Sequence, residues 1–177
     1  MEIKASSIHN FNTIRDFLHM GMFKKNNPKH GIILVSILYS FVILCILFSL
    51  FAFGYDLRFV ILLVVSILML VFFYTLYFIA PIVNYNSLAK MKDCKNIYIF
   101  GDEFIKSSTE SPHYTDNEEI KYSLFFKAYE TSKYIYLYRT KVQVYIVEKA
   151  TIEGGTIAEF RAKLVSYLEE NYITCNY

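Results

Sequence analysis

Two stretches of sequence decide the fold of this chain: GIILVSILYSFVILCILFSLFAF, residues 31–53, and FVILLVVSILMLVFFYTLYFIAPIV, residues 59–83. Neither stretch contains Asp, Glu, Lys, Arg or His. At about 1.5 Å per helical residue, each is longer than the roughly 30 Å hydrocarbon core of a bilayer. The five residues between them, Gly54 to Arg58, are only enough to turn the chain around. The sequence therefore predicts a transmembrane hairpin whose two polar ends lie on the same side of the membrane.

The charges that flank the hairpin predict its orientation. Lysines gather on the polar side: Lys24, Lys25, Lys29, Lys90, Lys92 and Lys95. The connecting turn carries a single Arg58, which Asp56 balances. Because basic residues favour the cytoplasmic side, we expect both termini in the cytoplasm and the turn outside. Three isolated cysteines fit this placement and predict no disulfide framework: Cys45, Cys94 and Cys175.

Residues 1–30 form a separate N-terminal segment in this interpretation, with a short strand followed by an amphipathic helix. The strand covers Glu2 to Ala5, and Ser7 is the expected N-cap of the helix. One apolar stripe follows at spacings of three or four: Ile8, Phe11, Ile14, Leu18 and Met22. Two hypotheses stay open, a helix lying on the membrane surface and a helix packed on the C-terminal domain.

Residues 84–177 have the pattern of a small β domain closed by a helix. Short runs rich in Ile, Val, Tyr and Phe predict strands at 96–100, 103–106, 124–130, 133–139 and 142–147. In residues 133–139, Tyr134, Tyr136 and Tyr138 share one face, and Ile135 and Leu137 share the other. Since neither face is strongly polar, we expect both to be at least partly covered.

Two further segments complete this domain. The polar stretch from Ser107 to Glu119 predicts an exposed loop between strands. Thr156, with Glu159 three residues later, is typical of a capping box and predicts the start of the last helix. The expected apolar stripe of that helix is Ile157, Phe160, Leu164, Tyr167 and Leu168.

The composition argues against several function classes. From Asn84 to the end there are 12 Lys and Arg against 13 Asp and Glu, so we expect neither a nucleic-acid partner nor a polybasic lipid-binding face. The four histidines are scattered, and no His-x-x-x-His or Cys-x-x-Cys spacing occurs: His9, His19, His30 and His113. We therefore expect no metal, no cofactor and no catalytic site.

The order of elements resembles the YcxB-like family of bacterial membrane proteins. Glu119-Ile120-Lys121-Tyr122-Ser123 is similar to the family's strand start I-x-W/Y-S, and Tyr129-Glu130 followed by residues 134–138 is similar to its next strand. Residues 146–152 resemble the family's I-P-K-x-x-F segment, in which Lys149 keeps its place while Glu148 and Ile152 depart from the pattern. The resemblance extends over nearly the whole chain.

The resemblance implies a membrane-anchored α+β chain in the bacterial plasma membrane. In that architecture, a two-helix transmembrane hairpin precedes a small β-sheet or barrel domain of pleckstrin-homology-like form, which a C-terminal helix closes. The family carries no agreed biochemical activity. Lys149 is interpreted as capping the turn between strand and helix, with head-group contact as the alternative.

Two functions fit this architecture, and both are non-enzymatic. In the first, the chain is an adaptor whose cytoplasmic domain binds an unknown cytoplasmic protein through exposed faces between Tyr134 and Tyr145 or through the 107–119 loop. Its candidate contact residues are Tyr134, Tyr136, Tyr138, Tyr145 and Lys149. In the second, by analogy with other systems, it gives self-immunity against a secreted membrane-active toxin or bacteriocin. Its candidate specificity residues lie in the outer turn: Tyr55, Asp56 and Arg58.

Both hypotheses leave the oligomeric state open, including a homo-oligomer in the lipid bilayer. Ser36 and Ser40, four residues apart, present a small face on the first span. Small residues let transmembrane helices approach closely.

Overall fold

The computed structural model describes residues 2–23, 27–88, 92–111 and 115–175. The chain forms two compact units, Ile14–Ser87 and a second that joins Met1–Thr13 to Leu88–Tyr177. We call them the hairpin unit and the β unit. This division differs from the one drawn from the sequence at residues 30 and 84, because the N-terminal strand belongs to a sheet of the β unit. The predictions that used Lys24, Lys25, Lys90 and His113 lie outside the described residues.

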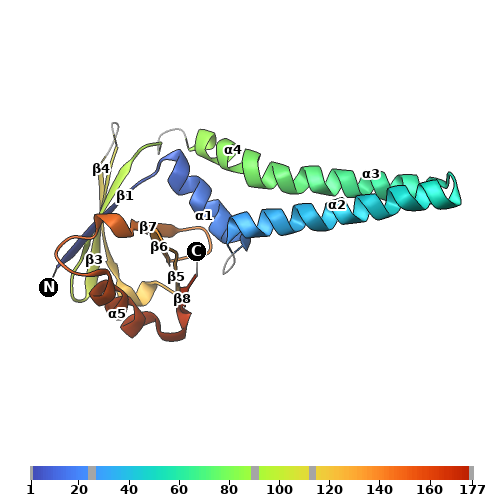
Figure 1. Ribbon diagram of the computed structural model, residues 1–177. Helices are drawn as coiled ribbons and strands as arrows, with labels where there is room; N and C mark the ends of the chain where they lie inside the picture. The colour runs from blue at the N-terminus through green and yellow to red at the C-terminus, as the bar shows by residue number, and fades with distance from the viewer. Residues whose placement is uncertain (1, 24–26, 89–91, 112–114, 176–177) are drawn as a thin grey trace. The chain divides into compact units, whose positions relative to one another are not determined.

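The two predicted long helices are confirmed. α2 covers Pro28–Phe53, and α3, Leu57–Tyr74, continues through a π-helical turn, η1 (Thr75–Ile79), into α4 (Ala80–Ser87) (Figure 1). Each is long and apolar enough to cross a membrane. Asn27 caps α2 by accepting a hydrogen bond from the Lys29 backbone N–H at 3.0 Å. Gly54 ends the helix with a φ of 84°, a conformation that favours glycine.

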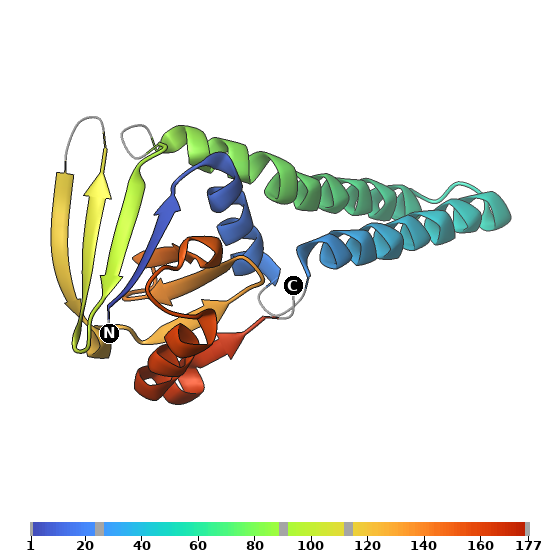
Figure 2. The same ribbon diagram turned by 60° about the vertical axis from the view of Figure 1, so that its left-hand side comes forward.

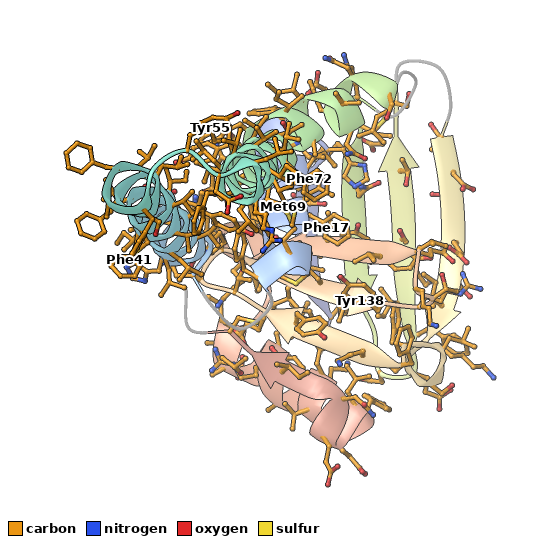
Figure 3. All side chains as sticks on the ribbon, turned by 90° about the vertical axis from the view of Figure 1, so that its right-hand side faces the viewer. Phe17, Phe41, Tyr55, Met69, Phe72 and Tyr138 are labelled. Atoms are coloured by element: carbon orange, nitrogen blue, oxygen red, sulfur yellow. The ribbon has the colours of Figure 1, made fainter. Side chains whose placement is uncertain are left out.

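The hairpin exposes apolar side chains and keeps its polar groups within its own helices. Figure 3 shows side chains spread over the outside of α2 and α3, with Phe41 64% and Phe72 53% exposed. Four hydroxyl groups each donate to the carbonyl four residues earlier: Ser36, Ser49, Ser66 and Thr75. Ser36 Oγ also lies 2.8 Å from the Tyr74 hydroxyl oxygen of α3, whereas Ser40 is exposed. These hydroxyls therefore need no water as a partner.

α1, Phe11–Phe23, starts in the β unit and continues in the hairpin unit, because the division falls after Thr13. Its N-cap is Asn10, whose Oδ1 accepts from the Thr13 N–H at 3.0 Å. The expected cap, Ser7, is instead a buried residue of β1. From Ile14 onward α1 groups with the hairpin helices, an arrangement that neither hypothesis for this helix contained.

The first sheet of the β unit is antiparallel and has the order β1-β2-β3-β4. Its strands are β1 (Ile3–Ile8), β2 (Lys95–Phe100), β3 (Phe104–Glu110) and β4 (Thr115–Lys121). One row of side chains crosses the sheet and is buried: Ile3, Phe100, Ile105 and Ile120. The first strand of the chain thus pairs with β2 across the whole intervening hairpin.

The prediction of an exposed loop from Ser107 to Glu119 is wrong. Ser107 to Glu110 continue β3, and Thr115 to Glu119 begin β4. Apart from Ser107, which is buried, these polar residues lie toward the end of β3 or on β4, the outer strand of the sheet (Figure 2). They form strands because their backbones pair with each other across β3 and β4. Charged side chains are common on the edge strand of a sheet.

The second sheet has the order β7-β6-β5-β8. Its strands are β5 (Lys127–Glu130), β6 (Tyr134–Tyr138), β7 (Val144–Glu148) and β8 (Tyr172–Thr174), of which β8 runs parallel to β5. The expectation that both faces of the 133–139 strand are covered is confirmed, since Tyr134 to Leu137 are buried. Short 3₁₀ turns join the elements: η3 (Tyr122–Leu124), η4 (Lys149–Thr151) and η5 (Glu169–Asn171).

α5, Ile157–Leu168, packs on the core of the β unit. The predicted capping box is confirmed, with Thr156 and Glu159 bonded to each other's backbone N–H. The buried stripe is narrower than expected: Phe160, Leu164 and Leu168 are buried, while Ile157 and Tyr167 are exposed. Neither sheet closes on itself, so the described fold is two four-stranded sheets and a C-terminal helix.

Candidate functional site

A buried ionic centre surrounds Glu130 at the end of β5. The Glu130 side chain is 1% exposed. Its carboxylate accepts hydrogen bonds from Arg161 Nε at 2.7 Å and Nη2 at 2.6 Å, from Lys149 Nζ at 2.7 Å and from the Tyr172 hydroxyl at 2.6 Å. These donors come from α5, η4 and β8, so one carboxylate joins three elements to β5.

The electrostatics of this centre favour the charged carboxylate. Burial alone raises the pKa of Glu130, but the hydrogen bonds from Arg161, Lys149 and Tyr172 outweigh it and lower the pKa to about 2. The same carboxylate, together with burial, raises the pKa of Tyr172. Glu130 therefore stays ionised, and Arg161, Lys149 and Tyr172 each donate a hydrogen bond to its carboxylate. This chemistry is typical of a structural ion pair.

Lys149, a predicted contact residue, belongs to this centre. Besides Glu130, its Nζ donates to the Thr131 carbonyl at 2.9 Å, and its side chain is 13% exposed. Its backbone N–H donates to the Lys133 carbonyl at 2.8 Å. The structure therefore places Lys149 as a clamp between the η4 turn and the β5–β6 turn.

The predicted tyrosines are placed in two different environments. Tyr134 and Tyr136 are buried at 6% and 0% exposure, so their rings are not on the surface. Tyr138 is half-buried and packs edge-on against Tyr129, with ring centroids 5.7 Å apart.

Tyr145 belongs to a polar cluster that joins the two sheets. Its hydroxyl donates to Glu118 Oε2 at 2.9 Å and accepts from Gln143 Nε2 at 2.9 Å. Arg139 pairs with the same Glu118 carboxylate. Glu118 lies on β4 of the first sheet and Tyr145 on β7 of the second. The cluster therefore links strands that no backbone pairing connects in the described part of the chain.

A shallow depression of about 290 Å³ lies over β2, β3 and β4. Its lining combines two isoleucines with polar and charged side chains, which we call the β4 face: Ile97, Ile99, Lys106, Ser108, Asn117 and Glu119. Lys106 and Glu119 form an exposed ion pair at 3.4 Å. β4 ends the sheet, and no other described strand pairs with its outer edge. The segment predicted as a contact loop is therefore an exposed strand edge with a depression beside it.

The predicted outer turn connects α2 to α3. Tyr55 is 81% exposed, and Arg58 is also exposed. Asp56 instead caps α3, with its Oδ1 accepting from the Arg58 N–H at 2.8 Å. All three predicted residues of the turn are therefore exposed, and Asp56 in addition caps α3.

Metal-binding chemistry is not assembled within the described ranges. In residues 2–23, 27–88, 92–111 and 115–175, no three His, Cys, Asp or Glu side chains gather in a way that could hold a metal ion. Cys94 and Cys175 are buried, and Cys45 is exposed on α2.

The comparison with protein families matches the middle of the β unit. Residues 100–164 match the family of YcxB-like proteins. The matched segment extends from the end of β2 into α5 and contains Glu130, Lys149 and Arg161. The resemblance is confirmed over this segment, which is shorter than the nearly complete chain expected from the sequence. No match was found among curated proteins or among solved structures.

The YcxB-like segments quoted from the sequence meet in the structure. Tyr129-Glu130 and the segment containing Lys149 form the ion pair, and Tyr122 stacks on Tyr167 of α5 with ring centroids 4.5 Å apart. The Tyr122 hydroxyl donates to the Gly101 carbonyl at 2.9 Å. These YcxB-like positions therefore hold the sheets and α5 together.

Sequence reasoning missed the Glu130 centre. The available signal was a glutamate that alternates with Ala128 on the core-facing side of a strand. A carboxylate at such a position needs a cationic partner, but the sequence does not say that Arg161 and Tyr172 supply the other donors.

Proposed function

We propose that this chain is a non-enzymatic integral membrane protein that holds a protein-binding β unit at the inner face of the bacterial plasma membrane. The observation that carries the proposal is the exposure of the hairpin's apolar side chains. In the most apolar window, 6% of the residues of Pro28–Phe53 and 0% of those of Leu57–Ser87 are buried. A core helix of a soluble protein would be mostly buried, so lipid is the environment that these surfaces fit.

The polar groups of the hairpin support the same environment. The hydroxyls of Ser36, Ser49, Ser66 and Thr75 bond to carbonyls of their own helices, as groups in a hydrocarbon must. In the sequence, Lys29 precedes the first apolar run and Lys92 follows the second, and basic residues favour the cytoplasmic side. Both termini are therefore proposed to be cytoplasmic, with a pleckstrin-homology-like arrangement of the β unit.

The β4 face is the proposed contact surface for a cytoplasmic protein. It offers an open strand edge, two half-buried isoleucines and a mixed-charge rim. An extended segment of a partner can pair with such an edge and place alternate side chains in the depression. Tyr134, Tyr136 and Lys149 are buried or engaged, so Asn117 and Glu119 replace them as the residues expected to contact a partner.

Site-specific photo-crosslinking tests this proposal in bacterial cells that express the full chain. A photoreactive residue replaces Asn117 on the β4 face or, as the matched control, the exposed Ala162 on α5. The proposal expects one reproducible adduct from position 117 that is lost when Glu119 is replaced by lysine. Equal adducts from both positions, or none from position 117, would contradict it.

Self-immunity is the second candidate, and the outer turn favours it. Phe51, Phe53 and Tyr55 are 91%, 81% and 81% exposed next to the turn, a group of aromatic side chains that an external membrane-active agent would meet first. This candidate expects protection of cells to depend on Tyr55 and Arg58. Protection that survives Tyr55→Ala and Arg58→Ala but is lost with Glu119→Lys would count against it.

A further inference from the structure

The inner end of the hairpin contains a backbone carbonyl that lacks its α-helical donor. In an α-helix the Tyr77 carbonyl would accept from residue 81, but residue 81 is proline and has no N–H. The helix is wound as the π-helical turn Thr75–Ile79 at this point, with the Ala80 N–H bonded to the Thr75 carbonyl. Such turns frequently mark functional sites, and here the turn coincides with a Tyr77 carbonyl that Pro81 leaves without its usual donor.

His19 of α1 supplies the missing donor. Its Nε2 lies 3.0 Å from the Tyr77 carbonyl oxygen, and because a carbonyl only accepts, Nε2 donates. The imidazole also stacks on the Tyr77 ring, with centroids 4.2 Å apart and an interplanar angle of 13°. Only 7% of His19 is exposed. The His19 side chain therefore hydrogen-bonds to the Tyr77 carbonyl and stacks on the Tyr77 ring.

Phe23 completes the contact one turn later. Its ring packs edge-on against Tyr77 at 6.2 Å. It also lies against Gly31 of α2, where an added Cβ would come within 2.4 Å of the ring. α1 thus contacts both helices of the hairpin at their inner end.

The other end of α1 is fixed in the β unit. Asn10 caps the helix, and the preceding His9 exchanges backbone hydrogen bonds with the two residues before β2. Its N–H donates to the Cys94 carbonyl at 3.0 Å, and its carbonyl accepts from the Asp93 N–H at 3.1 Å. These hydrogen bonds therefore hold the short connection between β1 and the first turn of α1 against the segment before β2.

We propose that α1 is a mechanical link that reports the state of the hairpin to the β unit, with His19 and the Tyr77 carbonyl as its latch. Because Pro81 offers no N–H, the carbonyl is open and holds His19. If the inner ends of α2 and α3 shift, the carbonyl moves away from His19 and α1 is released. This link goes beyond the proposed partner binding and does not depend on it.

Hydrogen exchange of the full chain in lipid nanodiscs tests the link. His19→Ala removes the donor, and Pro81→Ala supplies the N–H that lets Tyr77 bond within its own helix. His30→Ala, at an exposed histidine of α2, is the matched control. Both test variants are expected to speed exchange of α1 amides about tenfold, the size expected for loss of one buried hydrogen bond. They should also speed exchange of the His9 and Asp93 amides, while β6 amides stay protected and show that the β unit is folded.

The Pro81→Ala result separates a link from simple packing, because it leaves His19 intact and alters only the hairpin. Wild-type exchange of α1 in Pro81→Ala or in His19→Ala would overturn the proposal. So would a change in α1 without any change at His9 and Asp93, or an equal change in His30→Ala.

Discussion

The hairpin and the β unit satisfy their polar groups in opposite ways. In the hairpin, serine and threonine hydroxyls bond four residues back along the same helix. In the β unit, the decisive polar contacts join distant residues: Glu130 to Arg161, and Ser6 to Thr151, whose side-chain oxygen accepts from the Ser6 N–H at 2.8 Å. The polar groups of the hairpin are therefore satisfied by residues close in the sequence, and those of the β unit by residues far apart in it.

The largest expected effect comes from breaking the long-range pairing at its centre. Glu130→Gln removes the charge that holds Lys149 and Arg161, and leaves Lys149 as a buried cation without its counter-ion. Breaking a buried pair in this way costs about 3–5 kcal/mol. Urea unfolding of the β unit in detergent, followed by tyrosine fluorescence, measures it. Glu170→Gln, at an exposed position of η5, is the control, and an equal loss there would contradict the assignment.

Acid probes the same centre without a mutation. The pKa of Glu130 is lowered from 4.5 to about 2, so its contribution to stability is complete above about pH 4.5 and is lost as the pH falls toward 2. At about 1.4 kcal/mol per pKa unit the loss is on the order of 3 kcal/mol. Unfolding curves of wild type and Glu130→Gln should therefore converge as the pH falls. Parallel curves would show that the carboxylate is not the titrating group.

A matched pair of arginine substitutions sharpens the contrast between the two surfaces. Leu68 in α3 and Val142 in the β unit are both exposed, at 62% and 94%. Leu68→Arg is expected to lower membrane insertion by about 2.5–3.5 kcal/mol, the cost of arginine near a bilayer centre. Val142→Arg is expected to change neither insertion nor folding. An insertion assay that finds both variants equally integrated would mean that α3 does not lie in lipid.

The smallest expected effect concerns a local contact inside the β unit. Thr156→Ala removes the cap of α5, whose Oγ1 accepts from the Glu159 N–H at 3.2 Å. The expected loss is about 1 kcal/mol in urea unfolding. Ser166→Ala, which removes an exposed hydroxyl bonded to the Lys163 carbonyl, is expected to have a smaller effect. A larger loss at Ser166 than at Thr156 would show that the cap contributes little.

The features that followed from the sequence are local ones. The hairpin helices, the Gly54 turn and the Thr156 capping box depend on residues a few positions apart, and all three are present. The pairing of β1 with β2 was not predictable in this way, because the sequence pattern does not show that a strand at Ile3 bypasses the hairpin to meet Phe100.

The candidate contact residues show the same limit. A tyrosine every second residue indicated an at least partly covered strand face at Tyr134 and Tyr136, but not that both rings are too deeply buried to contact a partner. A polar run indicated exposure at Asn117, but not the strand pairing that makes it an edge. Burial and edge position depend on which strands become neighbours, and long-range pairing decides that.

Thiol labelling in spheroplasts tests the central claim most directly, because that claim is a membrane hairpin with the β unit on the cytoplasmic side. Tyr55→Cys in the turn and Asn117→Cys in the β unit are compared in the full chain, with the wild type, which carries three native cysteines, as background. A membrane-impermeant maleimide should label position 55 in intact spheroplasts and position 117 only after permeabilisation. Labelling of position 117 in intact spheroplasts, or of both positions only after permeabilisation, would contradict the account.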